Sequence, residues 1–280
     1  MNRFRNSLEL VRSSWKVLSA DRDLIWLPVV AMIATLIAAA SFVVPVAVLK
    51  GSTNGFGPPE YLLAALGYFV LAFITVFSNA ALIFGADERM RGGDPSFGSA
   101  VRGAWSRVGR IAPWAIVSAS VSLVLRAIEQ RGGIVGRIVG SLAGIAWSLV
   151  TFLVLPTLVV EDVGVRDAIK RSSEMFRRTW GEQVIANAGI GLVGFLAIVV
   201  AIPVVLLAAA VGGPVLVLGI VLFAVWALAV VAVTTALSAV FQTALYHYAA
   251  NGMPPAAFAT ADLAGAFRAK RSGSGRGMWS

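Results

Sequence analysis

The sequence predicts an all-α polytopic membrane protein in which six transmembrane helices form three hairpins. A cytoplasmic-side amphipathic elbow helix is expected before each hairpin. Three observations support this class. The 280 residues are 58% hydrophobic and 13% charged, whereas an ordinary soluble domain has about twice that charged fraction. The apolar residues fall into six long runs, and most basic residues lie between the runs.

Each apolar run can cross a bilayer, whose hydrocarbon core of about 30 Å requires about 20 helical residues. We expect spans at 24–49, 61–86, 111–128, 138–160, 184–211 and 215–250. The first run is too long for a cleaved signal peptide and should remain as an anchor. The last is longer than one bilayer requires, so its cytoplasmic end should tilt or project. Residues 1–252 form the expected membrane domain, and 253–280 an interfacial helix and disordered tail.

The distribution of Lys and Arg predicts the orientation, because cytoplasmic segments retain basic residues. With the N-terminus inside, the inner segments hold 19 of the 23 Lys and Arg residues. Both termini are therefore expected in the cytoplasm. The formal charge of +9 is spread over four short segments, so it indicates membrane topology and not nucleic-acid binding.

The three elbow helices are predicted at 3–20, 96–110 and 164–181, where apolar residues recur every three or four positions among basic residues. Basic helices that carry Trp are typical of membrane surfaces. The residues expected to contact anionic lipid or a partner complex are Arg12, Trp15, Arg102, Trp105, Lys170, Arg171, Arg177, Arg178 and Trp180. The alternative is that these helices only orient the hairpins and bind no specific partner.

Small residues recur at every fourth position from Gly136 through Gly140 and Gly144 to Ser148. Such a stripe lets another helix approach closely, and close packing is the main force between helices in lipid. The partner is expected within the chain, for example on the face that carries Ser118 and Ser122. A second protomer is the alternative.

A polar cluster is predicted near the cytoplasmic ends of three spans. Its members are Asn79, Asn187, Gln242, Tyr246 and His247. One interpretation is interhelical hydrogen bonding in a packed bundle. The other is a polar vestibule that opens at the inner leaflet.

Catalytic and metal-binding motifs are absent from the sequence. There is no Cys and a single His, the spans lack an HExxH or GxSxG motif, and the uncharged runs offer no ion-coupling residue. The glycine string at 189–194 lies inside an apolar run, where it cannot serve as a dinucleotide fingerprint. Asp87, Glu88, Asp94, Glu161 and Asp162 are expected to pair with nearby Arg residues more readily than with a metal. We therefore expect no cofactor, no metal and no enzymatic activity.

Three stretches carry a family resemblance: Glu161-Asp162-Val163-Gly164, Ala168-Ile169-Lys170-Arg171-Ser172 and Thr179-Trp180-Gly181-Glu182-Gln183. They resemble the central signature of an uncharacterised domain-of-unknown-function family of six-span prokaryotic membrane proteins. A looser similarity connects the chain with the membrane-anchor domains of bacterial glycerophosphodiester phosphodiesterases. The resemblance implies the topology and a prokaryotic plasma membrane, but no activity, since no phosphodiesterase domain accompanies the spans.

Three functional hypotheses follow. The first is a non-catalytic membrane-organising or accessory protein whose elbow helices contact anionic lipid, a partner protein or a second copy. The second is a passive transporter or lipid-handling protein that uses the inner-leaflet vestibule. The third is an intramembrane enzyme, which would gain support from a groove that brought His247 within hydrogen-bond reach of Asp or Glu.

Overall fold

The computed structural model describes residues 12–20, 22–51, 57–131, 133–180, 189–211 and 213–258, and all regular structure among them is helical. Residues 12–20 form a first helix. It is followed by η1 (Arg22–Ile25), α2 (Trp26–Gly51), α3 (Pro58–Met90), α4 (Phe97–Ser106), α5 (Val108–Arg131), α6 (Gly133–Thr151), α7 (Val154–Glu161), α8 (Val165–Trp180), α9 (Gly189–Val211), α10 (Gly213–Asn251) and η3 (Ala256–Phe258).

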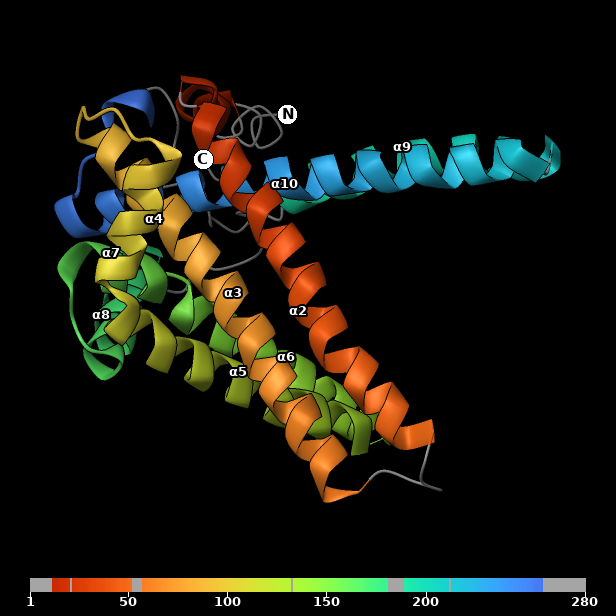
Figure 1. Cartoon of the computed structure of the whole chain (residues 1–280). Coiled ribbons are helices and arrows are strands. Elements are labelled where there is room, and N and C mark those ends of the chain that lie inside the picture. Colours follow the sequence, from red (N-terminus) through yellow and green to blue (C-terminus); the bar gives the residue numbers. More distant parts are fainter. Residues whose placement is uncertain are drawn as a thin grey trace, which may run out of the picture.

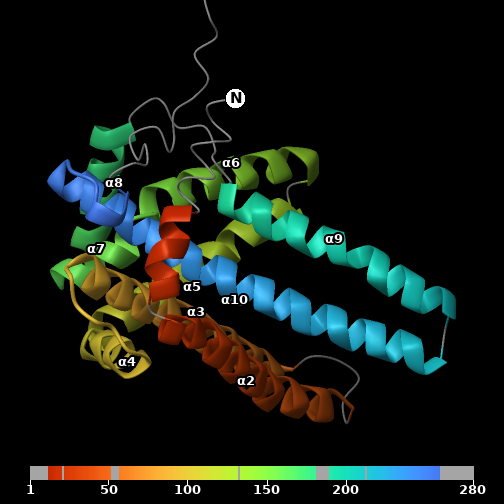
Figure 2. The same cartoon turned by 90° about the horizontal axis from the view of Figure 1, so that it is seen from above.

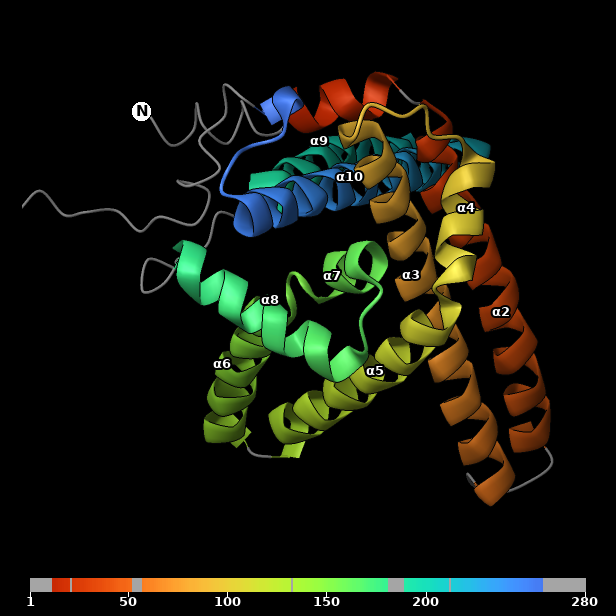
Figure 3. The same ribbon diagram turned by 90° about the vertical axis from the view of Figure 1, so that its left-hand side faces the viewer.

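The long helices pair as three antiparallel hairpins, α2–α3, α5–α6 and α9–α10, and each pair shares an extensive contact. Figures 1 and 2 show the hairpins diverging from one region of short helices. We call this region the junction; it comprises α4, α7, α8 and the adjoining ends of α3 and α10, as Figure 3 shows from the side of the short helices. Helix α3 is central to it, since it packs on α2, α4, α5, α7 and α10.

Five helical segments are long and apolar enough to cross a membrane: Asp23–Val48, Pro58–Met90, Val108–Gln130, Gly136–Glu161 and Gly213–Asn251. The described part of the run predicted at 184–211 is α9, in which Ala197–Ala210 is a shorter apolar helix. Helix α9 lies along α10, where the Trp226 indole Nε1 donates to the Ala197 carbonyl at 3.0 Å.

Buried side chains concentrate at the junction. Leu82, Ile83, Leu158 and Leu245 are almost completely covered there, whereas large apolar side chains farther along the hairpins are exposed. Leu207, for example, is 71% exposed. Soluble proteins rarely leave apolar surface uncovered on this scale. The hairpins are therefore suited to a lipid environment, and the protein-filled core lies mainly at their common end.

The predicted continuous span at 138–160 is interrupted: α6 ends at Thr151 and α7 begins at Val154. The backbone groups released by this break have side-chain partners from other helices. The Ser172 hydroxyl donates to the Val150 carbonyl at 2.6 Å and accepts from the Leu153 N–H at 3.1 Å. The Gln242 amide donates to the Phe152 carbonyl. Non-helical backbone at membrane depth requires such partners.

Helices also occupy the three ranges predicted for elbow helices. Helix α8 fills 165–180, and α4 fills only 97–106 of the predicted 96–110, because the chain turns at Arg107 before α5 begins. The Arg107 side chain pairs with Asp162, which adopts a left-handed backbone (φ 53°) at the end of α7. Residues 3–11 and 259–280 lie outside the described residues.

The stripe of small residues contacts the hairpin partner only at its first two positions. A Cβ placed on Gly136 would lie 2.6 Å from the Ile128 carbonyl oxygen, and one on Gly140 would lie 2.4 Å from the Glu129 Cγ. A Cβ on Gly144 would meet open space, and Ser148 is exposed. The close approach is thus within the chain, but it involves Ile128 and Glu129 of α5 and not the expected Ser118 and Ser122 face.

Candidate functional site

A polar cavity of about 530 Å³ lies among four helical elements near the junction. Such a volume is within the usual range for small-molecule sites. Its walls come from α3, α5, the break between α6 and α7, and α10. The lining residues are Val76, Asn79, Trp114, Ser118, Thr151, Phe152, Leu155, Thr234, Thr235, Ser238, Ala239 and Gln242.

The cavity lies where two hairpins separate. Helix α10 packs on α3 and α7, but neither α10 nor α9 makes extensive contact with α5 or α6. The α5–α6 and α9–α10 hairpins diverge from this point, as Figures 1 and 2 show from two directions. Trp114 forms part of the α5 wall and stacks on Trp147 of α6, with ring centroids 6.1 Å apart. The cavity thus occupies the apex of a wedge between hairpins.

Most hydroxyl groups of the cavity donate to their own helices. Thr151 donates to the Trp147 carbonyl at 2.7 Å, Thr234 to Val230 at 2.7 Å and Ser238 to Thr234 at 2.7 Å. A hydroxyl has one hydrogen and two acceptor lone pairs. These three groups can therefore offer only acceptor capacity to a molecule in the cavity.

Two side-chain amides face the same space. Gln242 donates one N–H to the Phe152 carbonyl and so closes the break in the α6–α7 segment from the α10 side. The Asn79 side chain has no hydrogen bond to any described residue. Asn79 thus leaves both donor and acceptor groups for a ligand, while Gln242 joins the site to the broken helix.

The predicted vestibule residues separate into two groups. Asn79 and Gln242 line the cavity, but Tyr246 and His247 lie beyond it and bond to carboxylates. The Tyr246 hydroxyl donates to Glu161 Oε1 at 2.9 Å, and His247 Nε2 lies 2.7 Å from Asp87 Oδ1. Asn187 lies outside the described residues.

These carboxylates also hold arginines. Arg171 of α8 pairs with Glu161, and Arg91 Nε donates to Asp87 at 3.1 Å. The adjacent residues Tyr246 and His247 therefore fasten the end of α10 to α7 and α3 at the same time. Asp162 is likewise paired, with Arg107 and Arg110. The described residues contain no group of three or more His, Cys, Asp or Glu residues suited to a metal ion.

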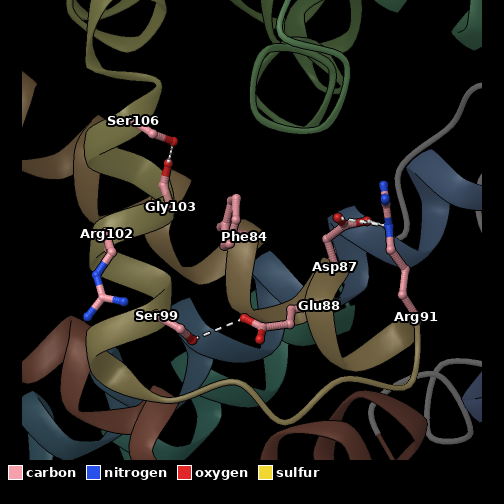
Figure 4. Close-up of a pocket in the computed structure, with 8 residues that line it drawn as sticks. All are labelled: Phe84, Asp87, Glu88, Arg91, Ser99, Arg102, Gly103 and Ser106. Carbon is pink, nitrogen blue, oxygen red and sulfur yellow. Dashed lines mark hydrogen bonds and ion pairs between the residues drawn. The ribbon is translucent and has the colours of Figure 1, made fainter.

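A second, more open hollow of about 520 Å³ lies between the end of α3 and α4. Figure 4 shows Glu88 directed toward Ser99 and Asp87 toward Arg91, while Arg102 points away from both acidic groups. The Ser99 hydroxyl donates to Glu88 Oε2 at 3.0 Å. The acidic groups of this hollow thus already have partners, so the hollow is less suited to ligand binding than the polar cavity.

The contact between His247 and Asp87 is the one that the enzyme hypothesis required. Both side chains are 13% exposed. No hydroxyl group of a described residue bonds to His247, and His247 does not line the hollow that includes Asp87. A His–carboxylate pair performs acid–base chemistry only with a substrate or nucleophile within reach. Its observed role is to join α10 to α3.

The residues predicted to contact lipid lie on exposed faces. Arg12, Arg102, Lys170, Arg171, Arg177 and Arg178 are exposed, as are Trp15 (46%) and Trp105 (63%). In α8 the residues that face the protein are Ala168, Ser172 and Phe176, all buried. Trp180 is the last residue of α8, and its side chain is outside the described set. The apolar sides of these helices therefore cover the junction, and the basic sides and the two Trp residues remain exposed, although Arg171 pairs with Glu161 and Trp105 contacts Phe77.

Sequence reasoning missed Ser172 and the partners of Tyr246 and His247. Ser172 lies on the stripe of recurring positions that predicted this helix, but its bonds to the backbone at Val150 and Leu153 were not predicted. Asp87 and Glu161 were expected to pair with nearby Arg residues, as they do with Arg91 and Arg171, but not with residues of α10. Their contacts with α10 join residues 160 and 85 positions apart, which hydropathy cannot relate.

Comparison with known proteins gives one match. The model described as "Family of unknown function (DUF6159)" matches residues 59–256, most of the chain. No curated protein and no solved structure matches.

Proposed function

The chain belongs to this family of unknown function, and from its geometry we propose that it is a passive lipid-handling protein. The observation that carries this proposal is the uncharged polar cavity beside a broken helical span. Non-helical backbone at membrane depth occurs where it is buried in protein or lines a cavity, and discontinuous helices form the binding sites of many transporters. No catalytic step forms part of the proposal.

The proposal includes six spans and a defined orientation. Helix α9 serves as the span paired with α10, and the basic residues around α4 and α8 support a junction on the cytoplasmic side of the membrane. Both termini then lie on the cytoplasmic side of a prokaryotic plasma membrane. In this orientation the cavity is at the depth of the inner leaflet.

The lining and the position of the cavity favour a lipid over an ion as its ligand. None of the described residues that line it is charged, and ion pathways through membranes usually require charged side chains. The diverging α5–α6 and α9–α10 hairpins give the apex of the wedge a route toward the surrounding lipid. A molecule that has both a polar end and an acyl chain fits such a lateral arrangement.

Photo-crosslinking tests the proposal. The full chain is reconstituted in vesicles with one diazirine-labelled acyl chain, carried in turn on phosphatidylethanolamine, phosphatidylglycerol and glucosyldiacylglycerol. At least one lipid should crosslink to cavity residues of α3 or α10, and Ser238→Trp should reduce that crosslink at least fivefold. Ala229→Trp, on the exposed side of α10, should not. Crosslinks confined to the outer faces of the hairpins, unchanged by Ser238→Trp, would refute lipid handling.

A second function, membrane organisation, is favoured by the exposed Trp residues beside exposed basic residues. Trp15 lies in one turn with Arg12 and Lys16, and Trp105 lies near Arg102. Trp prefers the headgroup region, and Arg and Lys attract anionic lipid there. The corresponding surface would contact lipid or a partner without using the cavity.

Lipid enrichment distinguishes this second function. Arg12, Arg102, Lys170, Arg177 and Arg178 are changed together to Gln, and Arg171 is kept because it pairs with Glu161. Native mass spectrometry should show at least a threefold loss of bound phosphatidylglycerol relative to phosphatidylcholine, with cavity crosslinks retained. Equal phosphatidylglycerol binding by the two proteins would rule out the surface role.

A further inference from the structure

The chemistry of the cavity lining restricts the ligand, if the cavity is the lipid site proposed above. Among the residues that the structure describes, no Asp, Glu, Lys, Arg or His lines it. A phosphate, carboxylate or ammonium group placed there would lose hydration without gaining a countercharge, which is unfavourable. The group that enters is therefore uncharged.

The hydrogen-bond inventory restricts the ligand further. Thr151, Thr234 and Ser238 use their hydrogens on backbone carbonyls, so they present acceptor lone pairs. A ligand must donate to satisfy them. Asn79 and Thr235 have no hydrogen bond to a described residue and can donate as well as accept. Hydroxyl groups satisfy both requirements, whereas an ester or ketone can only accept.

The rest of the cavity lining is apolar, and the volume of the cavity suits a small ligand. Val76, Trp114 and Leu155 face the same cavity of about 530 Å³. Ligand sites typically combine such an apolar wall with a few polar groups that fix orientation. A carbon skeleton that carries several hydroxyl groups matches this combination.

From these observations we infer that the cavity binds an uncharged polyhydroxyl group. Two sources share this chemistry: the headgroup of a neutral glycolipid and a free polyol or sugar. Asn79 is the principal orienting residue, because it offers both donor and acceptor groups, and Gln242 couples the bound group to the α6–α7 break through Phe152.

Site-specific labelling tests the inference, and the natural absence of Cys removes background reaction. Ser238→Cys is introduced in the full chain in lipid nanodiscs, and its reaction rate with a small maleimide is measured. The probes are glucosyldiacylglycerol in the bilayer, free glucose, and phosphatidic acid as a charged lipid without a polyol. Ser19→Cys, which is exposed and distant in sequence from the cavity, controls for general changes in reactivity.

Glucosyldiacylglycerol or glucose should slow labelling of Ser238→Cys at least fivefold, with Ser19→Cys unchanged. Protection by the lipid alone identifies a headgroup, and protection by glucose identifies a free solute. Asn79→Leu should abolish the protection, while Asn79→Ser, which keeps a hydroxyl donor and acceptor, should retain part of it. Both variants are compared by thermal unfolding to verify folding.

Two results would overturn the inference. Protection by phosphatidic acid and by neither polyol probe would refute the ligand class but leave lipid handling intact. Protection by no probe, together with crosslinks absent from the cavity, would refute both. Equal protection of the wild-type and Asn79→Leu backgrounds would exclude Asn79 as the orienting residue.

Discussion

Tyr246 and His247 show how two neighbouring side chains can fix one helix end. They project from α10 to different carboxylates, Glu161 on α7 and Asp87 on α3. Each carboxylate also holds an arginine, so neither interaction stands alone. In a membrane protein whose hairpins diverge, a few bonds at the common end have a large effect on how the helices are placed.

The contribution of the Tyr246 hydroxyl can be measured directly. Tyr246→Phe removes the donor to Glu161 while the ring stays in its buried position. We expect a loss of about 1.5–3 kcal/mol in the free energy of unfolding, since the acceptor is a carboxylate. Thermal unfolding in detergent is the measurement. Tyr248→Phe, with no hydrogen bond between its hydroxyl and a described residue, is the control; equal effects of the two changes would contradict the assignment.

The first glycines of the α6 stripe are the second test at this scale. Gly136→Ala places a methyl group 2.6 Å from the Ile128 carbonyl oxygen, a backbone atom that cannot rotate away. The added methyl group should push α5 and α6 apart and lower the free energy of unfolding by roughly 1–3 kcal/mol. Gly144→Ala on the same helix meets open space and should be neutral or slightly stabilising. The unfolding midpoints of the two variants in detergent should differ clearly. An unchanged midpoint for Gly136→Ala would contradict the close contact between α5 and α6.

At the scale of elements, the break between α6 and α7 is the most consequential feature. Pro156, four residues after Phe152, has no N–H to donate to the Phe152 carbonyl, so the sequence contains a usual cause of an interrupted helix. The released backbone groups are satisfied instead by Ser172 from α8 and Gln242 from α10. The break therefore has a local cause in Pro156 and also depends on tertiary contacts, and it both shapes the cavity and joins α8 to the bundle.

Ser172→Ala tests this dependence. The change leaves the Leu153 N–H without its hydroxyl partner and removes a donor from the Val150 carbonyl. A buried unsatisfied group costs about 1–3 kcal/mol, so unfolding in detergent should occur at a lower temperature and proteolysis near Phe152 should accelerate. The neighbouring Ser173 donates only to Lys170 of its own helix. Ser173→Ala should have little effect, and similar proteolysis of both variants would count against the proposed role of Ser172.

The sequence indicated the helical class and the approximate limits of most helices because these depend on local apolar content. The runs at 61–86 and 215–250 correspond to α3 and α10, which extend a few residues farther. It indicated a polar cluster of Asn79, Asn187, Gln242, Tyr246 and His247, of which Asn79 and Gln242 line one cavity. Pro156 was a usable signal for the broken span that the prediction of a continuous helix overlooked. The bonds of Tyr246 and His247 could not be predicted, because they arise from contacts between helices distant in the chain.

For the whole molecule, the structure changes the relative weight of the two functions. The sequence drew attention to the basic elbow helices, but α4, α8 and residues 12–20 bury part of their surface in the junction. Their exposed sides remain available to a membrane surface. The cavity, in contrast, combines an interrupted helix, free polar groups and a position between diverging hairpins, and each of these is costly to maintain in a bundle that serves only as an anchor.

The six-span arrangement itself is a prediction about the whole molecule, and the absence of Cys makes it accessible to single-cysteine labelling. If α9 crosses the membrane, Glu174→Cys and Asn251→Cys should react from one side and Pro214→Cys from the other. Ser96→Cys should react from the same side as Glu174→Cys, and Gln130→Cys from the same side as Pro214→Cys. The physical reason is the concentration of Lys and Arg beside α4 and α8, which keeps those segments in the cytoplasm. An impermeant maleimide applied to intact cells and to inverted membrane vesicles provides the measurement. Glu174 and Pro214 are the critical pair, since reaction of both from the same side would mean that α9 does not span the membrane and that the cavity lies in a five-span protein.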